Sequence, residues 1–396
     1  MSGNNPSGLS DRLRTVDLVI AGSGFYGATI AERAAAAGLE VALLEKRAHI
    51  GGNSYSERDD FSGIEIHRYG SHLFHTSNEK VWKYANRFTS FNDYRHVVWS
   101  THRGIPYPMP INLATISLFF GESMSPQSAR NLIERQKEPL GGEPANLEEK
   151  AISLIGRPLY EAFIEGYTQK QWQTSPRELP SSVISRLPVR FNFNHRYFAD
   201  TWEGLPVNGY TEWIASMLSS NRISTHTSLD FFDVRHLIPA ATPIVFTGPI
   251  DRYFDFSEGV LGWRTLDFEI VHHEVDDFQG TAVMNFADSE IPHTRVHEFK
   301  HLHPERETQP GKTVVMYEFS RFAGKDDEPY YPVNTVEDRR ALLKYRERAA
   351  RESNVFFGGR LGTYQYLDMH MAIASALTAW ENNLSPHYKG STTNEQ

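Results

Sequence analysis

The sequence contains no cysteine among its 396 residues. Without a thiol, the chain forms no disulfide, has no cysteine nucleophile and cannot hold a metal through sulfur. Flavoenzymes that reduce disulfides through a cysteine pair are excluded for the same reason. The chemistry must therefore come from other side chains or from a bound cofactor.

Long hydrophobic runs are also missing. The longest lies near Ile111–Phe120 and is too short to span a bilayer. The first 15 residues, MSGNNPSGLSDRLRT, are polar and lack the apolar core of a signal peptide. We therefore expect a cytoplasmic protein without membrane insertion, in which residues 1–14 form a loose tail.

Positive charge is in the minority. The chain has 40 basic and 49 acidic residues, and its formal net charge is −9. A net negative protein repels nucleic acid and anionic membranes at long range, so we expect it to bind neither. A local basic pocket for a small anionic molecule is compatible with this composition.

The most informative stretch that is present is Val16–Gly52. An apolar run that reads as a buried strand leads through Gly22-x-Gly24-x-x-Gly27 into an alanine-rich helix, and a second apolar run ends at Glu45. A strand, three spaced glycines, a helix and an acidic residue about 20 positions later are typical of a dinucleotide-binding βαβ unit.

Each glycine and the acidic residue of this unit has a chemical role in binding a dinucleotide. Gly22 permits a tight turn, Gly24 lets the backbone approach a pyrophosphate, and Gly27 lets the helix pack closely on the strand. The helix N-terminus offers free N–H groups to phosphates, and Glu45 can accept hydrogen bonds from ribose hydroxyls. A second glycine pair, Gly51-Gly52, is more typical of FAD-binding proteins than of NAD dehydrogenases.

A second glycine-rich unit stands near the other end of the chain. Asn354–Phe357 reads as a strand, Gly358–Gly362 as a turn and Met369–Asn382 as a helix preceded by Asp368. This pattern is typical of a fold that returns to its cofactor, with the helix N-terminus toward the flavin and Arg360 on the pyrophosphate. A terminal packing helix is the alternative interpretation.

The middle of the chain divides into a helical block and a strand-rich block. Amphipathic patterns predict the helices, and apolar alternation predicts the strands. Residues 174–190 are rich in proline and are expected to form an exposed loop that can act as a lid. The expected helices are 78–88, 112–120, 125–135, 146–155, 157–167 and 209–219, and the expected strands are 97–100, 191–198, 223–232, 243–247, 264–271, 281–286 and 313–319.

The predicted fold class is α/β: a Rossmann-like FAD-binding domain with an inserted helical domain and an antiparallel sheet domain. The acidic loop Lys325–Glu328 reads as a local elaboration that touches none of the motifs. The predicted boundaries are 1–95, 205–262 and 340–396 for the discontinuous FAD-binding domain, 111–185 for the helical domain with its lid loop near 174–190, and 96–110, 191–204 and 263–339 for the sheet domain.

Two histidines, His72 and His75, stand three positions apart in the segment His67–Thr76. Such a pair can ligate a metal ion, but no cluster of carboxylates stands nearby in the sequence, and Gly70 favours a turn over a continuous helix. We therefore predict no metal site.

Several longer motifs closely resemble those of bacterial UDP-galactopyranose mutases. They follow one another in the order of that family and cover nearly the whole chain, which makes a chance resemblance very improbable. The motifs are His67–Thr76 (HRYGSHLFHT), Gly166–Trp172 (GYTQKQW), Arg186–Phe191 (RLPVRF), Arg196–Phe198 (RYF), Tyr330–Asn334 (YYPVN) and Gly358–Met369 (GGRLGTYQYLDM).

The resemblance implies an isomerase that interconverts UDP-galactopyranose and UDP-galactofuranose and supplies galactofuranose for cell-surface glycans. It implies FAD as a cofactor that is active when reduced, with flavin N5 attacking the anomeric carbon and no net redox change. It further implies an external electron donor such as NAD(P)H, and a homodimer.

The resemblance also implies roles for single residues. Arg186 and Arg295 are expected on the UDP diphosphate, where two guanidiniums stabilise the leaving group, and His75 is expected beside the flavin as a third catalytic candidate. The residues expected to bind the substrate are Phe163, Tyr167, Trp172, Arg186, Tyr197, Phe198, Arg264, Arg295, Tyr331, Tyr366 and Asp368. The residues expected to bind the cofactor are Gly22, Gly24, Phe25, Gly27, Glu45, Lys46, Gly52, Asn53, His72, Gly359, Arg360, Tyr366 and Met369.

Other functions are compatible with part of the pattern. An FAD-dependent amine oxidase or desaturase shares the glycine motifs of both chain ends, but it has no need of paired arginines in its pocket. A nucleotide-sugar sensor would bind without chemistry. A mutase for another nucleotide sugar, such as an N-acetylated or deoxy hexose, would share most of the motifs.

Overall fold

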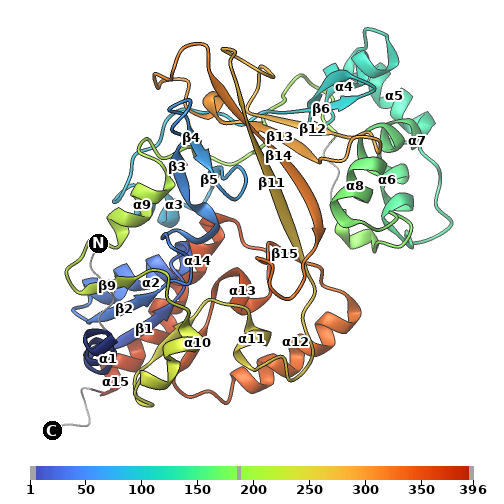
Figure 1. The fold of residues 1–396 in the computed structure, drawn as a ribbon. Helices are drawn as coiled ribbons and strands as arrows, with labels where there is room; N and C mark the ends of the chain where they lie inside the picture. Colours follow the sequence, from blue (N-terminus) through green and yellow to red (C-terminus); the bar gives the residue numbers. More distant parts are fainter. Residues whose placement is uncertain (1–5, 185–188, 392–396) are drawn as a thin grey trace.

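The computed structural model describes residues 6–184 and 189–391. Two sheets form the body of the molecule, and a group of helices packs at the end of the second sheet that lies away from the first (Figure 1). Within the described residues, no helix combines the length and the apolar character needed to cross a membrane.

The first sheet has five parallel strands in the order β16-β10-β1-β2-β9. The strands and the helices on its two faces are β1 Leu18–Ala21, β2 Val41–Leu44, β9 Ile223–His226, β10 Ile244–Phe246, β16 Val355–Phe357, α1 Pro6–Thr15, α2 Phe25–Ala36, α10 Phe231–Val234 and α14 Met369–Ala379. In β1, Leu18 and Ile20 point into the core formed with α2 and α14, whereas Val19 and Ala21 point into the core formed with α1 and α10. The sheet is therefore covered on both faces, which explains why its strands are apolar at consecutive positions.

The second sheet has seven strands in the order β15-β11-β14-β13-β12-β6-β7. The strands are β6 Val98–His102, β7 Ile105–Met109, β11 Trp263–His273, β12 Val283–Phe286, β13 Arg295–Glu298, β14 Thr313–Phe322 and β15 Tyr331–Pro332. Strands β11 and β14 pair over ten residues, and all neighbours are antiparallel except β12 and β6. The expected antiparallel sheet is thus confirmed with one parallel pair, which forms where the upstream hairpin β6–β7 joins the edge.

The helical group packs on the seven-stranded sheet through β7 and β14. Its helices are α4 Leu113–Phe120, α5 Pro126–Gln136, α6 Leu147–Ile155, α7 Arg157–Tyr160 and α8 Gly166–Trp172. The side chains of Asn112, Ser125 and Asn146 cap the first three helices by accepting hydrogen bonds from first-turn N–H groups. Helix α7 continues through the π turn Glu161–Glu165 into α8, so the last helix predicted here extends to Trp172.

The remaining elements lie between and around the two sheets. They are β3 Ser56–Arg58, β4 Glu65–His67, β5 Phe74–Thr76, α3 Glu79–Ala85, β8 Trp202–Gly204, α9 Tyr210–Met217, α11 Ile250–Tyr253, α12 Val336–Ala349, α13 Gly359–Thr363 and α15 Ser385–Ser391, with 3-10 or π turns at Gly52–Ser54, Ser181–Val183, Arg235–Leu237, Phe299–Leu302 and Trp380–Leu384.

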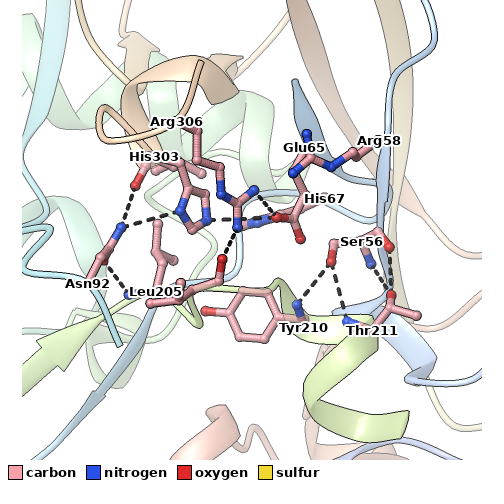
Figure 2. Close-up of polar contacts among 12 residues, drawn as sticks. Ser56, Arg58, Glu65, His67, Asn92, Leu205, Tyr210, Thr211, His303 and Arg306 are labelled. Atoms are coloured by element: carbon pink, nitrogen blue, oxygen red, sulfur yellow. Dashed lines mark hydrogen bonds and ion pairs between the residues drawn. The ribbon is translucent and has the colours of Figure 1, made fainter. Parts of the chain in front are cut away.

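A buried polar cluster joins strand β4 to the segment that precedes β14 of the second sheet (Figure 2). Glu65 on β4 is 8% exposed and accepts a hydrogen bond from Arg306 at 2.5 Å, and Arg306 also donates to the Val207 carbonyl at 2.6 Å. Gly209 has φ +87°, and a Cβ there would stand 2.0 Å from the Glu65 carboxylate. Asn92 donates to the Leu302 carbonyl at 3.1 Å and completes the joint. These bonds fix the position of the sheet relative to the nucleotide domain.

The N-terminal segment differs from the prediction. Residues expected as a loose tail form helix α1 from Pro6, because Leu13 is fully buried beneath the sheet. Arg12 pairs with Glu40 at 2.9 Å and donates to Ser224 at 3.1 Å. The helix therefore covers the sheet edge formed by β9.

One predicted strand was also wrong, and another was too long. In residues 191–198, the side chains of Asn192 and Asn194 accept hydrogen bonds from nearby backbone N–H groups, and these local turns replace a strand ladder. The strand expected over 223–232 ends at His226, because Asp230 caps helix α10. Of the expected lid loop, residues 174–184 contain the turn Ser181–Val183, and Ser185–Pro188 lie outside the described residues.

Candidate active site

A cleft of about 630 Å³ opens at the carboxyl ends of strands β1 and β2. The glycine turn before α2, the end of β2 and the start of α13 line it. In open parallel sheets, ligands bind at this edge, where strand order reverses. Strand β1 lies between β10 and β2, so the reversal falls at the glycine turn.

The glycine turn is shaped for close approach. Gly22 has φ +107°, and a Cβ there would lie 2.0 Å from the Thr247 hydroxyl. A Cβ on Gly27 would lie 2.0 Å from the Gly22 carbonyl oxygen, so the helix must pack tightly on the strand. At Gly24, a Cβ would meet no described atom within 4 Å, and no side chain caps helix α2. This open turn and uncapped helix N-terminus fit a dinucleotide pyrophosphate.

Glu45 at the end of β2 is buried and held by the protein itself. Its carboxylate accepts hydrogen bonds from the Ser23 N–H at 3.0 Å, the Ser23 hydroxyl at 2.7 Å and the Arg47 N–H at 3.0 Å. The carboxylate is thereby fixed at the cleft wall. Its contact with ribose hydroxyls stays a prediction.

The acidic loop after β14 crosses the mouth of this cleft, contrary to the prediction that it touches no motif. Glu328 pairs with Lys46 at 2.7 Å and with Arg47 at 2.8 Å, and both basic residues directly follow Glu45. Asp327 pairs with Arg321 and anchors the base of the loop. We call residues 323–329 the strap, since they line the cleft from the side of the second sheet.

The second glycine unit faces the first across the cleft. A Cβ on Gly358 would lie 2.1 Å from the Tyr26 ring, so β16 and α2 approach closely. Arg360 donates to the Tyr330 carbonyl at 3.2 Å and to the Leu367 carbonyl at 2.6 Å. Its guanidinium lies 4.9 Å from the Tyr366 ring centre. Arg360 therefore stands between the cleft and a group of tyrosines.

An ion pair and two rings mark a second part of the site, beyond Arg360. Arg295 on β13 pairs with Glu318 on β14 at 3.1 Å. Tyr331 lies near both, because each contributes to its electrostatic environment. The Tyr331 and Tyr366 rings are 5.8 Å apart, and the Tyr366 hydroxyl donates to Asp368 at 2.7 Å. These side chains come from β13, β14, β15 and the loop before α14.

Glu318 is the buried partner that holds this pair. His297 contacts its Oε2 at 3.1 Å, and the Thr294 hydroxyl donates at 3.3 Å to Oε1, the oxygen that faces Arg295. Ser71 contacts the second ring nitrogen of His297 at 2.7 Å. Burial acts to raise the pKa of Glu318, but the positive charge of Arg295 and these hydrogen bonds outweigh it and keep the pKa below its ordinary value. The carboxylate is therefore ionised and orients Arg295.

His75 on β5 lies at the junction between the cleft and the tyrosines. Its Nδ1 contacts Asp200 at 2.7 Å, and its ring stacks on Phe198 with centres 3.7 Å apart. His370 meets the His75 ring edge-on at 4.8 Å. Potential ligand atoms of His75, Asp368 and His370 lie within 4.8 Å of one another. The contact with Asp200 fixes the orientation of the His75 ring.

Helix α8 brings two further predicted residues to the site. Tyr167 lies near Arg295, and burial raises its pKa to about 12, so the hydroxyl is neutral. The carbonyl of Trp172 accepts a bond from Arg264 at 3.4 Å. Arg264 is 1% exposed, also contacts Ser320 at 3.0 Å, and burial lowers its pKa to about 10. It supports the end of α8 from inside the protein.

Three other predicted residues differ in how they relate to this cluster. Phe163 lies apart from it, buried in the helical core, and packs on Tyr107 at 5.0 Å. Tyr197 is half exposed, meets Phe198 edge-on at 5.0 Å and lies near Arg295 and Tyr167, because it contributes to the electrostatic environment of both. Arg186 lies outside the described residues. The substrate roles of these three residues stay predictions.

Sequence reasoning missed three residues of the site. Glu318, Asp200 and Lys170 each hold a functional side chain or segment, but Glu318 and Asp200 stand outside the quoted motifs, and a lysine within a motif was given no role of its own. Lys170 lies inside GYTQKQW, and its position one turn after Gly166 on the same helix face was the available signal.

Comparisons with known proteins agree with this geometry. The family model for UDP-galactopyranose mutase matches residues 162–366, and a model for an NAD(P)-binding Rossmann-like domain matches residues 20–88. The chain is 41% identical to a probable UDP-galactopyranose mutase of Klebsiella pneumoniae, with coverage of 93% of this chain and 95% of the relative. It is 40% identical to a dTDP-fucopyranose mutase of Escherichia coli, with coverage of 91% and 96%.

A solved structure supports the fold. The crystal structure of a reduced UDP-galactopyranose mutase matches with a TM-score of 0.69 and 15% identity, covering 94% of each chain. Fold and cleft together define an enzyme built on a Rossmann-like dinucleotide-binding domain. The family match is more specific, and the chain belongs to the UDP-galactopyranose mutase family. It is therefore an isomerase.

Proposed function

We propose that the protein is a UDP-galactopyranose mutase that interconverts UDP-galactopyranose and UDP-galactofuranose. The observation that carries the proposal is the Arg295–Glu318 pair, which places a fixed cation among tyrosines next to a dinucleotide cleft. A diphosphate needs such a cation, and a sugar needs the polar aromatic walls.

FAD is the proposed cofactor, and the cleft fits it. The open turn at Gly24 and the uncapped start of α2 suit a pyrophosphate, and Glu45 stands at the cleft wall. Arg360 and Met369 line the other side. When bound in its reduced form, the flavin supplies a nucleophilic nitrogen for the anomeric carbon, with no net redox change.

The side chains around the cleft prepare the substrate for this chemistry. Arg295 offers donors to the diphosphate and stabilises the negative charge that grows as UDP leaves. Glu318 keeps the guanidinium oriented, so little reorganisation is needed during the reaction. Tyr331 and Tyr366 keep neutral hydroxyls, because burial raises the pKa of both, and neutral hydroxyls can donate hydrogen bonds to phosphate oxygens.

His75 has a supporting part in this proposal. Its Nδ1 contacts Asp200 at 2.7 Å, so the ring cannot turn freely. The Nε2 atom then has a fixed direction at the junction of the two parts of the site. Arg186 is proposed as the second diphosphate cation on the strength of the sequence resemblance alone.

A second candidate substrate is a deoxy sugar carried by another nucleotide. The relative described as a dTDP-fucopyranose mutase is 40% identical, against 41% for the probable UDP-galactopyranose mutase, so overall identity does not discriminate between them. A diphosphate and a pyranose ring are common to both substrates. An amine oxidase is disfavoured, since an apolar amine has no use for Arg295.

The test is turnover of purified, FAD-loaded protein with UDP-galactofuranose and, separately, with dTDP-fucofuranose. We expect the dithionite-reduced enzyme to convert UDP-galactofuranose to the pyranose with the higher kcat/KM, and the oxidised enzyme to be nearly inactive. Equal rates in both redox states, or oxygen consumption with amines, would contradict the proposal. The electron donor NAD(P)H, the homodimer, the cytoplasmic location and the use of galactofuranose in cell-surface glycans stay predictions from the sequence.

A further inference from the structure

The ammonium group of Lys170 lies inside a ring of four backbone carbonyls. Its Nζ donates to the oxygens of Phe286 at 2.7 Å, Asp288 at 2.8 Å, Ile291 at 2.9 Å and His293 at 3.1 Å. Phe286 is the last residue of β12 and the other three carbonyls belong to the connection between β12 and β13, whereas Lys170 belongs to α8 of the helical group. The Lys170 side chain of the helical group thus binds the backbone of a loop that belongs to the second sheet.

This arrangement differs from the usual environments of a lysine. A surface lysine typically makes one loose ion pair with a carboxylate. Here, all four hydrogen bonds of the ammonium group go to neutral backbone carbonyl oxygens. Carbonyl oxygens that converge on one point do for a cation what its hydration shell does in water. The loop is therefore a cation-binding cage, and Lys170 supplies the cation from within the protein.

A second, independent contact shows how closely the helix and the loop fit. A Cβ on Gly166 would stand 2.3 Å from the Ala287 carbonyl oxygen, so only glycine allows this approach. Gly166 and Lys170 are four residues apart and share one face of α8. The face that Gly166 and Lys170 share is thus sealed against the β12–β13 connection by one steric and one electrostatic contact.

The caged loop leads directly into the substrate site. Its last caged residue, His293, is two positions before Arg295, the first residue of β13. On the helix, Tyr167 follows Gly166 and lies near Arg295. A loop that lost its central cation would shift Arg295 relative to Tyr167.

We propose that Lys170 is a positioning residue, an internal cation that organises the β12–β13 connection and so sets Arg295 against Tyr167 at the diphosphate site. The expected effect on kinetics rests on the proposed function, whereas the cage around Lys170 does not. A cage built around a cation accepts another cation of similar size once the lysine is removed.

The experiment compares Lys170→Ala with Lys170→Arg and with the control Lys83→Ala, whose side chain on α3 is 73% exposed. We expect Lys170→Ala to raise KM for UDP-galactose about 10-fold or more with a smaller change in kcat, and Lys83→Ala to change neither. Ammonium, methylammonium or potassium should restore KM in the alanine variant, because contacts of 2.7 to 3.1 Å suit these ions better than the smaller sodium. Tetramethylammonium chloride keeps the ionic strength constant.

Two outcomes would overturn the proposal. One is a Lys170→Ala enzyme with unchanged KM. The other is a lowered affinity that all salts, including tetramethylammonium, restore equally.

The melting temperature of Lys170→Ala should also rise with potassium or ammonium, and this readout needs no turnover. If the wild-type enzyme fails to act on UDP-galactose while this melting response is present, the proposed function fails and the cage stands. If Lys170→Ala does not fold, the same titrations apply to Lys170→Met refolded with and without ammonium, and a failure of ammonium to improve its folding contradicts the cage.

Discussion

Arg295 and Glu318 are directly opposite one another on the antiparallel strands β13 and β14, and their side chains meet at 3.1 Å on the same face of the sheet. The Glu318 side chain is 2% exposed, whereas that of Arg295 is 30% exposed. The carboxylate is therefore a fixed internal anchor, and the guanidinium is the part that reaches toward a ligand.

Removing the guanidinium should damage catalysis far more than folding. We expect Arg295→Ala to lower kcat/KM for UDP-galactofuranose by the equivalent of about 2–5 kcal/mol, the scale for lost contacts between buried charges. Arg295→Lys should recover only part of this loss, because an ammonium cannot replace a planar fork. Steady-state kinetics with a thermal melt of each variant checks this, and a lysine variant with full activity would show that only charge matters.

Neutralising the anchor should have a different signature. Glu318→Gln keeps the shape of the side chain but leaves Arg295 without its counter-charge, so we expect a lower kcat and a higher KM. The pKa of Glu318 is below its ordinary value of 4.5, so its stabilising contribution is complete above that pH and is lost as the pH falls through the folded value. The wild-type melting temperature should therefore fall more steeply than that of Glu318→Gln below about pH 4.5. Parallel curves would exclude this linkage.

The strap makes a prediction about cofactor retention. Glu328→Gln removes the partly exposed pair to Lys46, which is worth up to about 1 kcal/mol, and also the pair to Arg47, whose side chain is largely buried. We expect the dissociation constant for FAD to rise about 3- to 10-fold, measured by flavin fluorescence during titration of the apoprotein. Asp326→Asn is the matched control, because Asp326 is an exposed residue of the same loop. Equal FAD affinities in both variants and the wild type would mean that the strap does not retain the cofactor.

The cage around Lys170 should make substrate affinity depend on pH. Burial lowers the pKa of Lys170 to about 8, against the favourable effect of Asp288 and Glu290. Burial, and then the charge of Lys170, lower the pKa of His293. Above pH 8 the amine has one donor fewer for the four carbonyls, so we expect KM to rise there. The KM of Lys170→Arg should stay flat, since arginine keeps its proton.

Stability should move in the opposite direction to affinity. Between about pH 8 and the ordinary lysine pKa of 10.5, the unfolded state binds more protons at Lys170 than the folded state does. The contribution of this group to the free energy of unfolding therefore rises with pH over that range. The difference between the wild type and Lys170→Met in chemical denaturation, followed from pH 7 to 10, isolates this term. A difference that falls with pH would contradict it.

Local sequence signals predicted the nucleotide unit well. The strand β1, the three glycines and helix α2 follow from short-range patterns, in which Gly22 has a positive φ, Gly27 makes a close contact and Gly24 leaves the turn open. The helices after Asn112, Ser125 and Asn146 were predictable because a capping side chain marks each start. These features depend on residues only a few positions apart.

Contacts between distant segments were not predictable in this way. Asp200 meets His75 across 125 positions, and Lys170 meets Phe286 across 116. Neither contact has a local pattern, and each requires the complete chain path. The segment 191–198 misled for the opposite reason, since its aromatic alternation resembles a strand while Asn192 and Asn194 satisfy the backbone locally. The strap was dismissed because its charges find their partners only in the folded chain.

The cleft is lined by segments that are far apart in the sequence. Gly22 follows the central strand β1, and Gly359 follows the edge strand β16. Strands β1 and β2 and helix α2 precede the edge strand β16 and helix α14 by a long stretch of chain, so the two walls of the cleft come from segments that meet only in the folded protein. A ligand that contacts both glycine units binds only when these segments are together, so its binding free energy is added to the stability of the closed arrangement.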